Sequence, residues 1–155
     1  MAREEVQGKN KRYILLVEDD QDDIDLTRLA LKQNNITSDV IVKSDGRQAL
    51  HFIEELAESE NTDELKPTVI LLDINMPEVD GLSVLKKLKA TASVKEIPVV
   101  MLSSSDEKRD VENSYKYGAN SFIQKPADFE DFVFAVKHIG KYWLDLNKTA
   151  AHKTV

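Results

Sequence analysis

The chain has 155 residues, of which 41% are hydrophobic and 32% charged, a composition that is ordinary for one globular domain with a substantial core. It contains no cysteine, which excludes disulfides, thiolate catalysis and cysteine-ligated metal sites. The formal net charge of -7 argues against a standing role in nucleic-acid binding, because nucleic-acid-binding domains are usually basic on at least one face.

Five short apolar segments are predicted to form strands. The segments 13–17 and 69–72 are continuous aliphatic runs, which are typical of strands buried on both faces of a parallel sheet. Three further strands are predicted at about 39–43, 97–102 and 120–124.

Helical segments separate these strands. Apolar residues spaced three or four positions apart predict helices over 22–34, 46–57, 82–89, 106–117 and 128–146. Strands that alternate with helices form right-handed βαβ units. We therefore predict an α/β fold, a doubly wound five-stranded parallel sheet with helices on both faces.

One domain is predicted over residues 12–142, with flexible tails at 1–11 and 147–155 and no output domain. The polar segment 59–66 is predicted to be an extended surface loop before the third strand. The sequence holds no apolar stretch long enough to span a membrane and no signal-peptide core. We therefore expect a cytoplasmic protein that does not associate with membranes.

Acidic residues follow two of the predicted strands. Glu18 and Asp19 come directly after 13–17, and Asp73 comes directly after 69–72. If the strand order is 2-1-3-4-5, these residues meet in one crevice at the carboxyl end of the sheet. Three carboxylates repel one another unless a cation lies among them, and an all-oxygen donor set favours Mg²⁺. The alternative is that each acid is merely solvated or caps the helix that follows.

Two further polar residues follow the fourth and fifth strands. Ser103 could offer its hydroxyl to a phosphoryl oxygen, although a serine here can also cap a helix. We expect Ser105 or Asp106 to provide that cap, so the site prediction depends on Ser103. Lys125, followed by Pro126, would project an ammonium into the same crevice and bind phosphate, unless it is an ordinary surface lysine.

Four segments in this order resemble the receiver domain of two-component response regulators. They are Val17-Glu18-Asp19-Asp20, the run from Leu72 to Gly81 (LDINMPEVDG), the run from Pro98 to Ser103 (PVVMLS) and Lys125-Pro126. The resemblance covers about residues 12–142. It implies the flavodoxin-like strand order 2-1-3-4-5.

The resemblance also implies a phosphorelay role. Asp73 corresponds to the aspartate that accepts a phosphoryl group from a sensor histidine kinase. Asp19 is then expected to bind Mg²⁺ directly and Glu18 largely through water, while Asn75 completes the metal site with its backbone carbonyl. Ser103 and Lys125 correspond to the residues that contact the phosphoryl group.

The same resemblance implies a signalling switch. Phe122 corresponds to the family's switch aromatic, which turns inward when Ser103 moves toward the phosphoryl group. The signal would pass to protein partners through the face formed by the predicted helix 106–117, the strand 120–124 and the helix 128–146.

Aromatic residues near the C-terminus predict a protein interface. Phe134 falls off the apolar stripe of the last helix, Tyr142 and Trp143 extend it, and Tyr115 lies on the preceding helix. The alternative is that Tyr142 and Trp143 fold back onto the domain. Together with the polar insertion at 57–66, this extension resembles the stand-alone regulators that partner cyanobacterial phytochrome kinases. That resemblance implies a homodimer.

Two other functional classes share part of this pattern. One is a receiver-like binding module that no longer accepts phosphate; the retained acidic, hydroxyl and lysine residues argue against it. The other is an aspartyl-phosphate phosphatase of the haloacid-dehalogenase type, which needs a second aspartate two residues after the nucleophile, where this chain has Asn75. We therefore expect no enzymatic activity beyond the chain's own phosphotransfer and dephosphorylation.

Overall fold

The computed structural model describes residues 12–59 and 65–148. The predicted tail at 1–11, the tail at 147–155 apart from its first two residues, and the middle of the predicted loop 59–66 lie outside the described residues. In the described ranges, no helix combines the length and apolar character needed to cross a membrane.

The sheet is entirely parallel, with the strand order β2-β1-β3-β4-β5, so the predicted topology is confirmed. Its strands in chain order are β1 (Tyr13–Val17), β2 (Asp39–Lys43), β3 (Val69–Leu72), β4 (Val99–Ser103) and β5 (Ser121–Gln124). The order is that of a doubly wound sheet, in which the strands run outward in both directions from β1 and β3.

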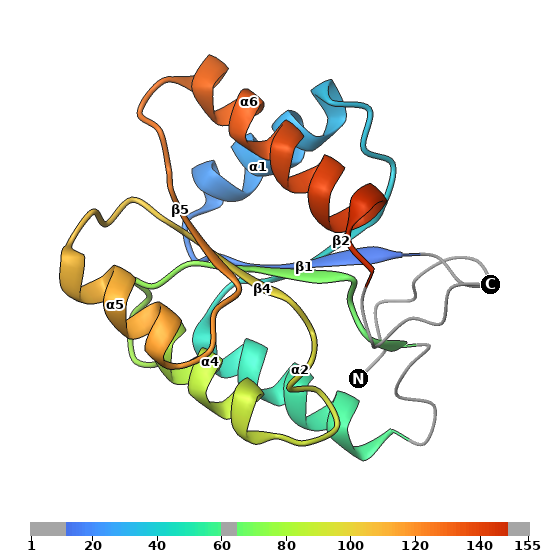
Figure 1. Ribbon diagram of the computed structural model, residues 1–155, viewed down its shortest axis with the longest axis vertical. Helices are drawn as coiled ribbons and strands as arrows, with labels where there is room; N and C mark the ends of the chain where they lie inside the picture. Colours follow the sequence, from blue (N-terminus) through green and yellow to red (C-terminus); the bar gives the residue numbers. More distant parts are fainter. Residues whose placement is uncertain (1–11, 60–64, 149–155) are drawn as a thin grey trace.

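Helices cover both faces of the sheet (Figure 1). One face carries α1 (Gln21–Gln33) and α6 (Phe129–Gly140), and the other carries α2 (Gly46–Glu58), α4 (Gly81–Ala90) and α5 (Lys108–Lys116). A short π-helical segment, η1 (Lys141–Leu146), continues α6.

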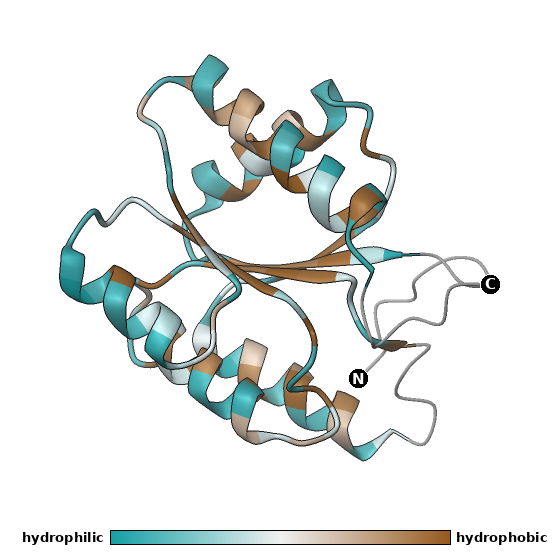
Figure 2. Cartoon of the chain, in the orientation of Figure 1, coloured by the Kyte–Doolittle hydropathy of each residue, from teal (hydrophilic) through white to brown (hydrophobic). Residues whose placement is uncertain are grey.

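Successive residues of the central strands point into two separate cores. In β1, Ile14 and Leu16 pack against α1 and α6, while Leu15 and Val17 belong to the core on the side of α2 and α4. Figure 2 shows this layering, with hydrophobic strands between helices whose outer surfaces are hydrophilic. Because helices cover both faces of the sheet, strands made entirely of apolar residues are fully buried here. This explains why the aliphatic runs of β1 and β3 predicted buried strands correctly.

Most element boundaries differ from the prediction by one or two residues, and the last predicted helix, 128–146, is divided into α6 and η1 at Gly140. β4 begins at Val99 rather than 97 and includes Ser103 as its last residue. α5 begins at Lys108, and its N-cap residue Glu107 makes no capping hydrogen bond through its side chain. The predicted capping by Ser105 or Asp106 is therefore wrong. The Ser105 hydroxyl instead donates to Asp110 Oδ2 at 2.6 Å and accepts from the Glu107 N–H at 3.3 Å.

Candidate functional site

The carboxyl ends of β1 and β3 bring the predicted acidic residues together. Val17 pairs with Leu72 in the sheet, and the next hydrogen bond along the ladder runs from the Asp73 N–H to the Val17 carbonyl at 3.1 Å. Glu18, Asp19 and Asp73 each place one carboxylate oxygen within 4.8 Å of the others. Residues 54 positions apart therefore line one crevice.

Asp73 is held in a nearly buried position, with 7% of its surface exposed. Its Oδ1 accepts a hydrogen bond from the Ile74 N–H at 2.9 Å. The start of α4 fits closely against this turn: the Gly81 N–H donates to the Ile74 carbonyl, and a Cβ on Gly81 would lie 1.9 Å from the Asp73 carbonyl oxygen. Burial raises the pKa of Asp73, although the charge of Lys125 opposes the rise.

Lys125 links the site to the start of α1. Its Nζ lies 2.5 Å from Glu18 Oε2 and 3.0 Å from Asp23 Oδ2, and only 10% of its side chain is exposed. Burial raises the pKa of Glu18 to about 7, against the opposing effect of Lys125. Burial also disfavours the charged form of Lys125, but the hydrogen bond to Glu18 and the charge of Asp73 outweigh this effect and raise its pKa.

Sequence reasoning missed Asp23. The signal that could have found it is the pair Asp20 and Asp23, in which Asp20 caps α1 and accepts a hydrogen bond from the Asp23 N–H. A cap at this position starts α1 directly beyond β1, so that the first turn of the helix faces the same crevice as Glu18.

Ser103 and Lys125 are neighbours through their backbones. The Lys125 N–H donates to the Ser103 carbonyl at 2.7 Å, which extends the β4–β5 ladder past Gln124. Ser103 is fully buried, and its Oγ accepts a hydrogen bond from the Ser105 N–H at 3.2 Å. Asn75 is exposed, two residues beyond Asp73.

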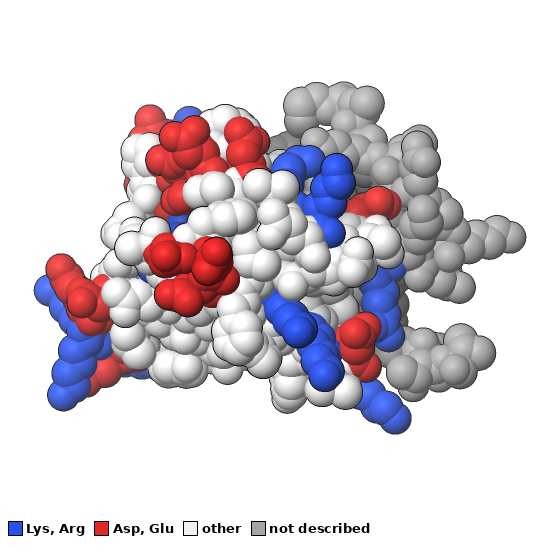
Figure 3. Space-filling model, turned by 90° about the horizontal axis from the view of Figure 1, so that it is seen from above, with Lys and Arg blue, Asp and Glu red and all other residues white. Residues whose placement is uncertain are grey.

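The donor set fits a hard divalent cation. The three clustered side chains offer only carboxylate oxygens, which are the ligands that Mg²⁺ and similar ions prefer. Asp19 is exposed, so the crevice is open to solvent, and the burial that raises the pKa of Glu18 and Asp73 is a cost that a bound cation would relieve. Both α1 and α6 have acidic first turns, and Figure 3 shows acidic side chains gathered in clusters on this side of the molecule.

The family model of the response regulator receiver domain matches residues 14–137. The chain belongs to this family. The resemblance predicted from the sequence is confirmed, and the acidic crevice lies within the matched residues of this receiver domain.

Relatives of this receiver domain include regulators linked to phytochromes. Response regulator Rcp1 of Synechocystis sp. is 37% identical over 134 residues, which cover 86% of this chain and 90% of Rcp1. The phosphorylated cyanobacterial phytochrome response regulator RcpA superposes with a TM-score of 0.81 at 34% identity, covering 90% of this chain and 99% of RcpA. The Mn²⁺-bound form of Rcp1 has a TM-score of 0.78 at 34% identity, covering 89% and 98% of the two chains.

The aromatic residues predicted to form an interface do not behave alike. Phe134 is 63% exposed and Tyr142 is 49% exposed, whereas Trp143 is half-buried against the core under α1 and α6. For Trp143, the alternative of folding back onto the domain is therefore the one observed. Tyr115 is 51% exposed on α5, across the sheet from α6, and its hydroxyl accepts a hydrogen bond from the Phe122 N–H at 3.2 Å.

Phe122 lies on the edge strand β5 between these helices. It is half-buried against the core on the side of α2 and α4, and it is paired in register with Met101 of β4. Its contact with Tyr115 connects the edge strand to α5.

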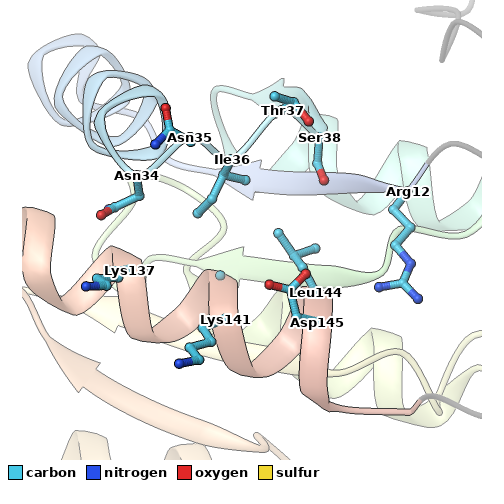
Figure 4. A pocket seen from close by; sticks show the side chains of 11 residues that line it. Arg12, Asn34, Asn35, Ile36, Thr37, Ser38, Lys137, Lys141, Leu144 and Asp145 are labelled. Carbon is cyan, nitrogen blue, oxygen red and sulfur yellow. The ribbon is translucent and has the colours of Figure 1, made fainter.

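A cavity of about 350 Å³ lies at the opposite end of the sheet (Figure 4). Its lining includes Arg12, which precedes β1, Ile36 and Ser38 in the loop before β2, and Lys141 and Leu144 on η1. Because the acidic crevice is at the carboxyl ends of the strands and this cavity is at their amino ends, the cavity is separate from the candidate site.

Proposed function

We propose that this protein is a response regulator that accepts a phosphoryl group on Asp73 from a sensor histidine kinase, with Mg²⁺ as its cofactor. The observation that carries the proposal is the convergence of one nearly buried aspartate with two further carboxylates and a lysine. Membership of the receiver-domain family supports the same function.

In this mechanism an oxygen of Asp73 attacks the phosphorus of a phosphohistidine. The phosphorus–nitrogen bond breaks, the imidazole leaves, and an acyl phosphate remains on Asp73. Glu18, Asp19, Asp73 and the backbone of Asn75 would hold the Mg²⁺ ion, which supplies charge neutralisation for the transferred phosphoryl group. Lys125 compensates the remaining negative charge.

The signal then follows from the added charge. Phosphorylation adds about -1.5 to -2 charges, which draw the Ser103 hydroxyl toward the phosphoryl group. Ser103 would give up its hydrogen bond with Ser105, and Phe122 would turn inward from the edge strand. The face formed by α5, β5 and α6 would then change its affinity for protein partners.

Partners of this receiver unit are proposed from its relatives and its surface. The similarity to Rcp1 and RcpA supports a phytochrome-type histidine kinase as the phosphoryl donor. The exposed Phe134 and Tyr142 on α6 and η1 support a homodimer. We place the receiver unit at 12–142, with η1 packed onto it through the buried Leu144. We further propose a cytoplasmic location, no binding of nucleic acid or membranes, and no enzymatic turnover of external substrates.

The decisive experiment is phosphorylation by a small phosphoramidate donor with Mg²⁺, followed by mass spectrometry of the intact protein. We expect one phosphoryl group on the wild-type protein and none on Asp73→Asn. Asp131→Asn, which changes an exposed aspartate in the first turn of α6, serves as the control and should be labelled normally. Stoichiometric labelling of Asp73→Asn at another residue would contradict the proposal.

A further inference from the structure

Lys125 is bound by two carboxylates, and one of them stands outside the proposed metal cluster. Its ammonium contacts Glu18 Oε2 at 2.5 Å and Asp23 Oδ2 at 3.0 Å. Glu18 also belongs to the group of three carboxylates within 4.8 Å of one another, whereas Asp23 does not. Of the two partners, Asp23 is therefore the one that binding of a cation leaves free to hold the lysine.

The position of Asp23 is fixed by the backbone of α1. The Asp23 N–H donates to Asp20 Oδ1 at 3.1 Å, and the Asp23 carbonyl accepts a hydrogen bond from the Thr27 hydroxyl at 2.7 Å. Thr27 is buried, with 1% of its surface exposed. The Asp23 carboxylate is thus presented by an anchored first turn of a helix rather than by a loose loop.

The N–H donors of the Lys125 ammonium are divided among its neighbours. An ammonium group has three N–H donors, and here two of them are occupied by carboxylates from the start of α1 and the end of β1. One donor remains, and a carboxylate oxygen of Glu18, which the ammonium contacts, lies within 4.8 Å of a carboxylate oxygen of Asp73. With two donors held by Glu18 and Asp23, the third is available to a group on Asp73.

We infer that Asp23 is a positioning residue of the phosphoryl site, which orients the Lys125 ammonium toward the phosphoryl group on Asp73. The inference rests on the proposed function. A competing explanation is that Asp23 only stabilises the N-terminus of α1 through its negative charge. Asp22 lies in the same first turn, is exposed and has the same charge, so it separates the two explanations.

The test compares Asp23→Ala and Asp23→Asn with Asp22→Ala and Asp22→Asn in full-length protein. The rate of phosphorylation by phosphoramidate is measured at saturating Mg²⁺, with thermal unfolding of each variant recorded beside it. We expect Asp23→Ala to slow phosphorylation roughly tenfold, because a misdirected charge loses most of its effect, and Asp23→Asn to slow it less. Both Asp22 variants should stay within about twofold of wild type.

A second comparison isolates the path through Lys125. In a Lys125→Ala background, Asp23→Ala should cause no further loss of rate, because the group that it orients is gone. An equal loss in both backgrounds would overturn the inference. Asp23→Glu should recover part of the rate that Asp23→Ala loses, and a rate no better than that of Asp23→Ala would also count against orientation by a carboxylate.

A direct measurement covers the case in which the double variant does not fold. The Lys125 ammonium protons of the wild-type protein should exchange slowly enough for NMR detection, and Asp23→Ala but not Asp22→Ala should abolish that signal. Normal labelling of the wild type with an unchanged rate in Asp23→Ala would refute the inference alone and leave the proposed function standing. Absence of labelling in the wild type would refute both.

Discussion

The centre and the edge of the sheet carry different parts of the site. β1 and β3 are buried at every position and carry Glu18 and Asp73 at their ends. β5 is an edge strand with three half-buried residues and one exposed residue, and it carries Phe122 and leads into Lys125. The groups that define the acidic crevice are thus mounted on the most firmly packed strands. Of the two groups proposed to move, Phe122 belongs to this edge strand, whereas Ser103 ends the buried strand β4.

The difference has a physical basis. A strand packed on both faces opens only when the whole domain unfolds, so its end residues keep a fixed separation. An edge strand is paired on one side only and can shift at lower cost. This arrangement suits the proposed function, in which Asp73 stays in place while Phe122 responds to the added charge.

The largest expected effect is on stability, and it compares two residues of the same core. Leu71 of β3 is fully buried, whereas Ile123 of β5 is half-buried against the same cluster. Leu71→Ala should lower the free energy of unfolding by about 3–4 kcal/mol, and Ile123→Ala by about 1–2 kcal/mol. Urea denaturation measures both losses, provided that the slope of the unfolding free energy against urea concentration is the same in the variants and the wild type. Equal losses would remove the proposed distinction between centre and edge.

The next effect concerns pH in the absence of divalent metal. Because the pKa of Glu18 rises from 4.5 to about 7 on folding, the folded protein binds this proton more tightly than the unfolded chain. Stability from Glu18 is therefore fully present below about pH 4.5 and is lost as the pH rises to 7, by up to about 3 kcal/mol. The raised pKa of Asp73 acts in the same direction.

Chemical denaturation between pH 4.5 and 8 with a chelator tests this expectation. Glu18→Gln should lose most of this pH dependence, and added Mg²⁺ should reduce it in the wild type. Glu55→Gln is the control for removing a carboxylate elsewhere. Glu55 lies on α2, its side chain is half-exposed, and it pairs with His51. If the stability of the wild type and that of Glu18→Gln change equally with pH, the burial of Glu18 is excluded as the cause of the pH dependence.

A third prediction concerns the exposed aromatic residues of α6 and η1. Replacing Phe134 and Tyr142 by alanine should weaken self-association by about 1–2 kcal/mol while leaving the unfolding transition nearly unchanged, because neither residue belongs to the core. Trp143→Ala should instead reduce stability, because its ring packs on the core beneath α1 and α6. Sedimentation that shows the same oligomer for the double variant would argue against this interface.

The sequence was most informative where one local pattern determined the outcome. Continuous aliphatic runs predicted β1 and β3, and an acid at the end of each run placed Glu18 and Asp73 at one edge of the sheet. The contact between Lys125 and Asp23 could not be predicted in the same way. It joins residues 102 positions apart through the exact start of α1, and that start depends on a capping hydrogen bond rather than on hydrophobic periodicity.

Two other misses have different origins. Ser105 is a residue type that often caps helices, yet its hydroxyl donates to Asp110 while α5 begins further on, so a tertiary contact decided the result. Trp143 was grouped with Tyr142 in the predicted interface, but it lies four residues after Ile139, on the buried stripe of α6, and it packs against the core under α1 and α6. For Trp143 the helical spacing therefore already favoured burial, which its aromatic character alone did not indicate.

The smallest expected effect concerns the loop that follows Asp73. Glu78 has φ of 65°, a left-handed conformation that costs a non-glycine residue roughly 1–2 kcal/mol. Its carboxylate forms an ion pair with Arg47 at 2.9 Å, but both side chains are more than 70% exposed, so this pair contributes little. Glu78→Gly should therefore raise the free energy of unfolding by about 1 kcal/mol or less, after allowance for the greater freedom of glycine in the unfolded chain. Arg47→Ala, which breaks the ion pair without changing the backbone at Glu78, should have an effect near zero. If Glu78→Gly and Arg47→Ala destabilise the protein equally, the ion pair rather than the backbone conformation governs the stability of this loop. The loop after Asp73 would then be held by surface charge instead of by the packed strand β3 that precedes it.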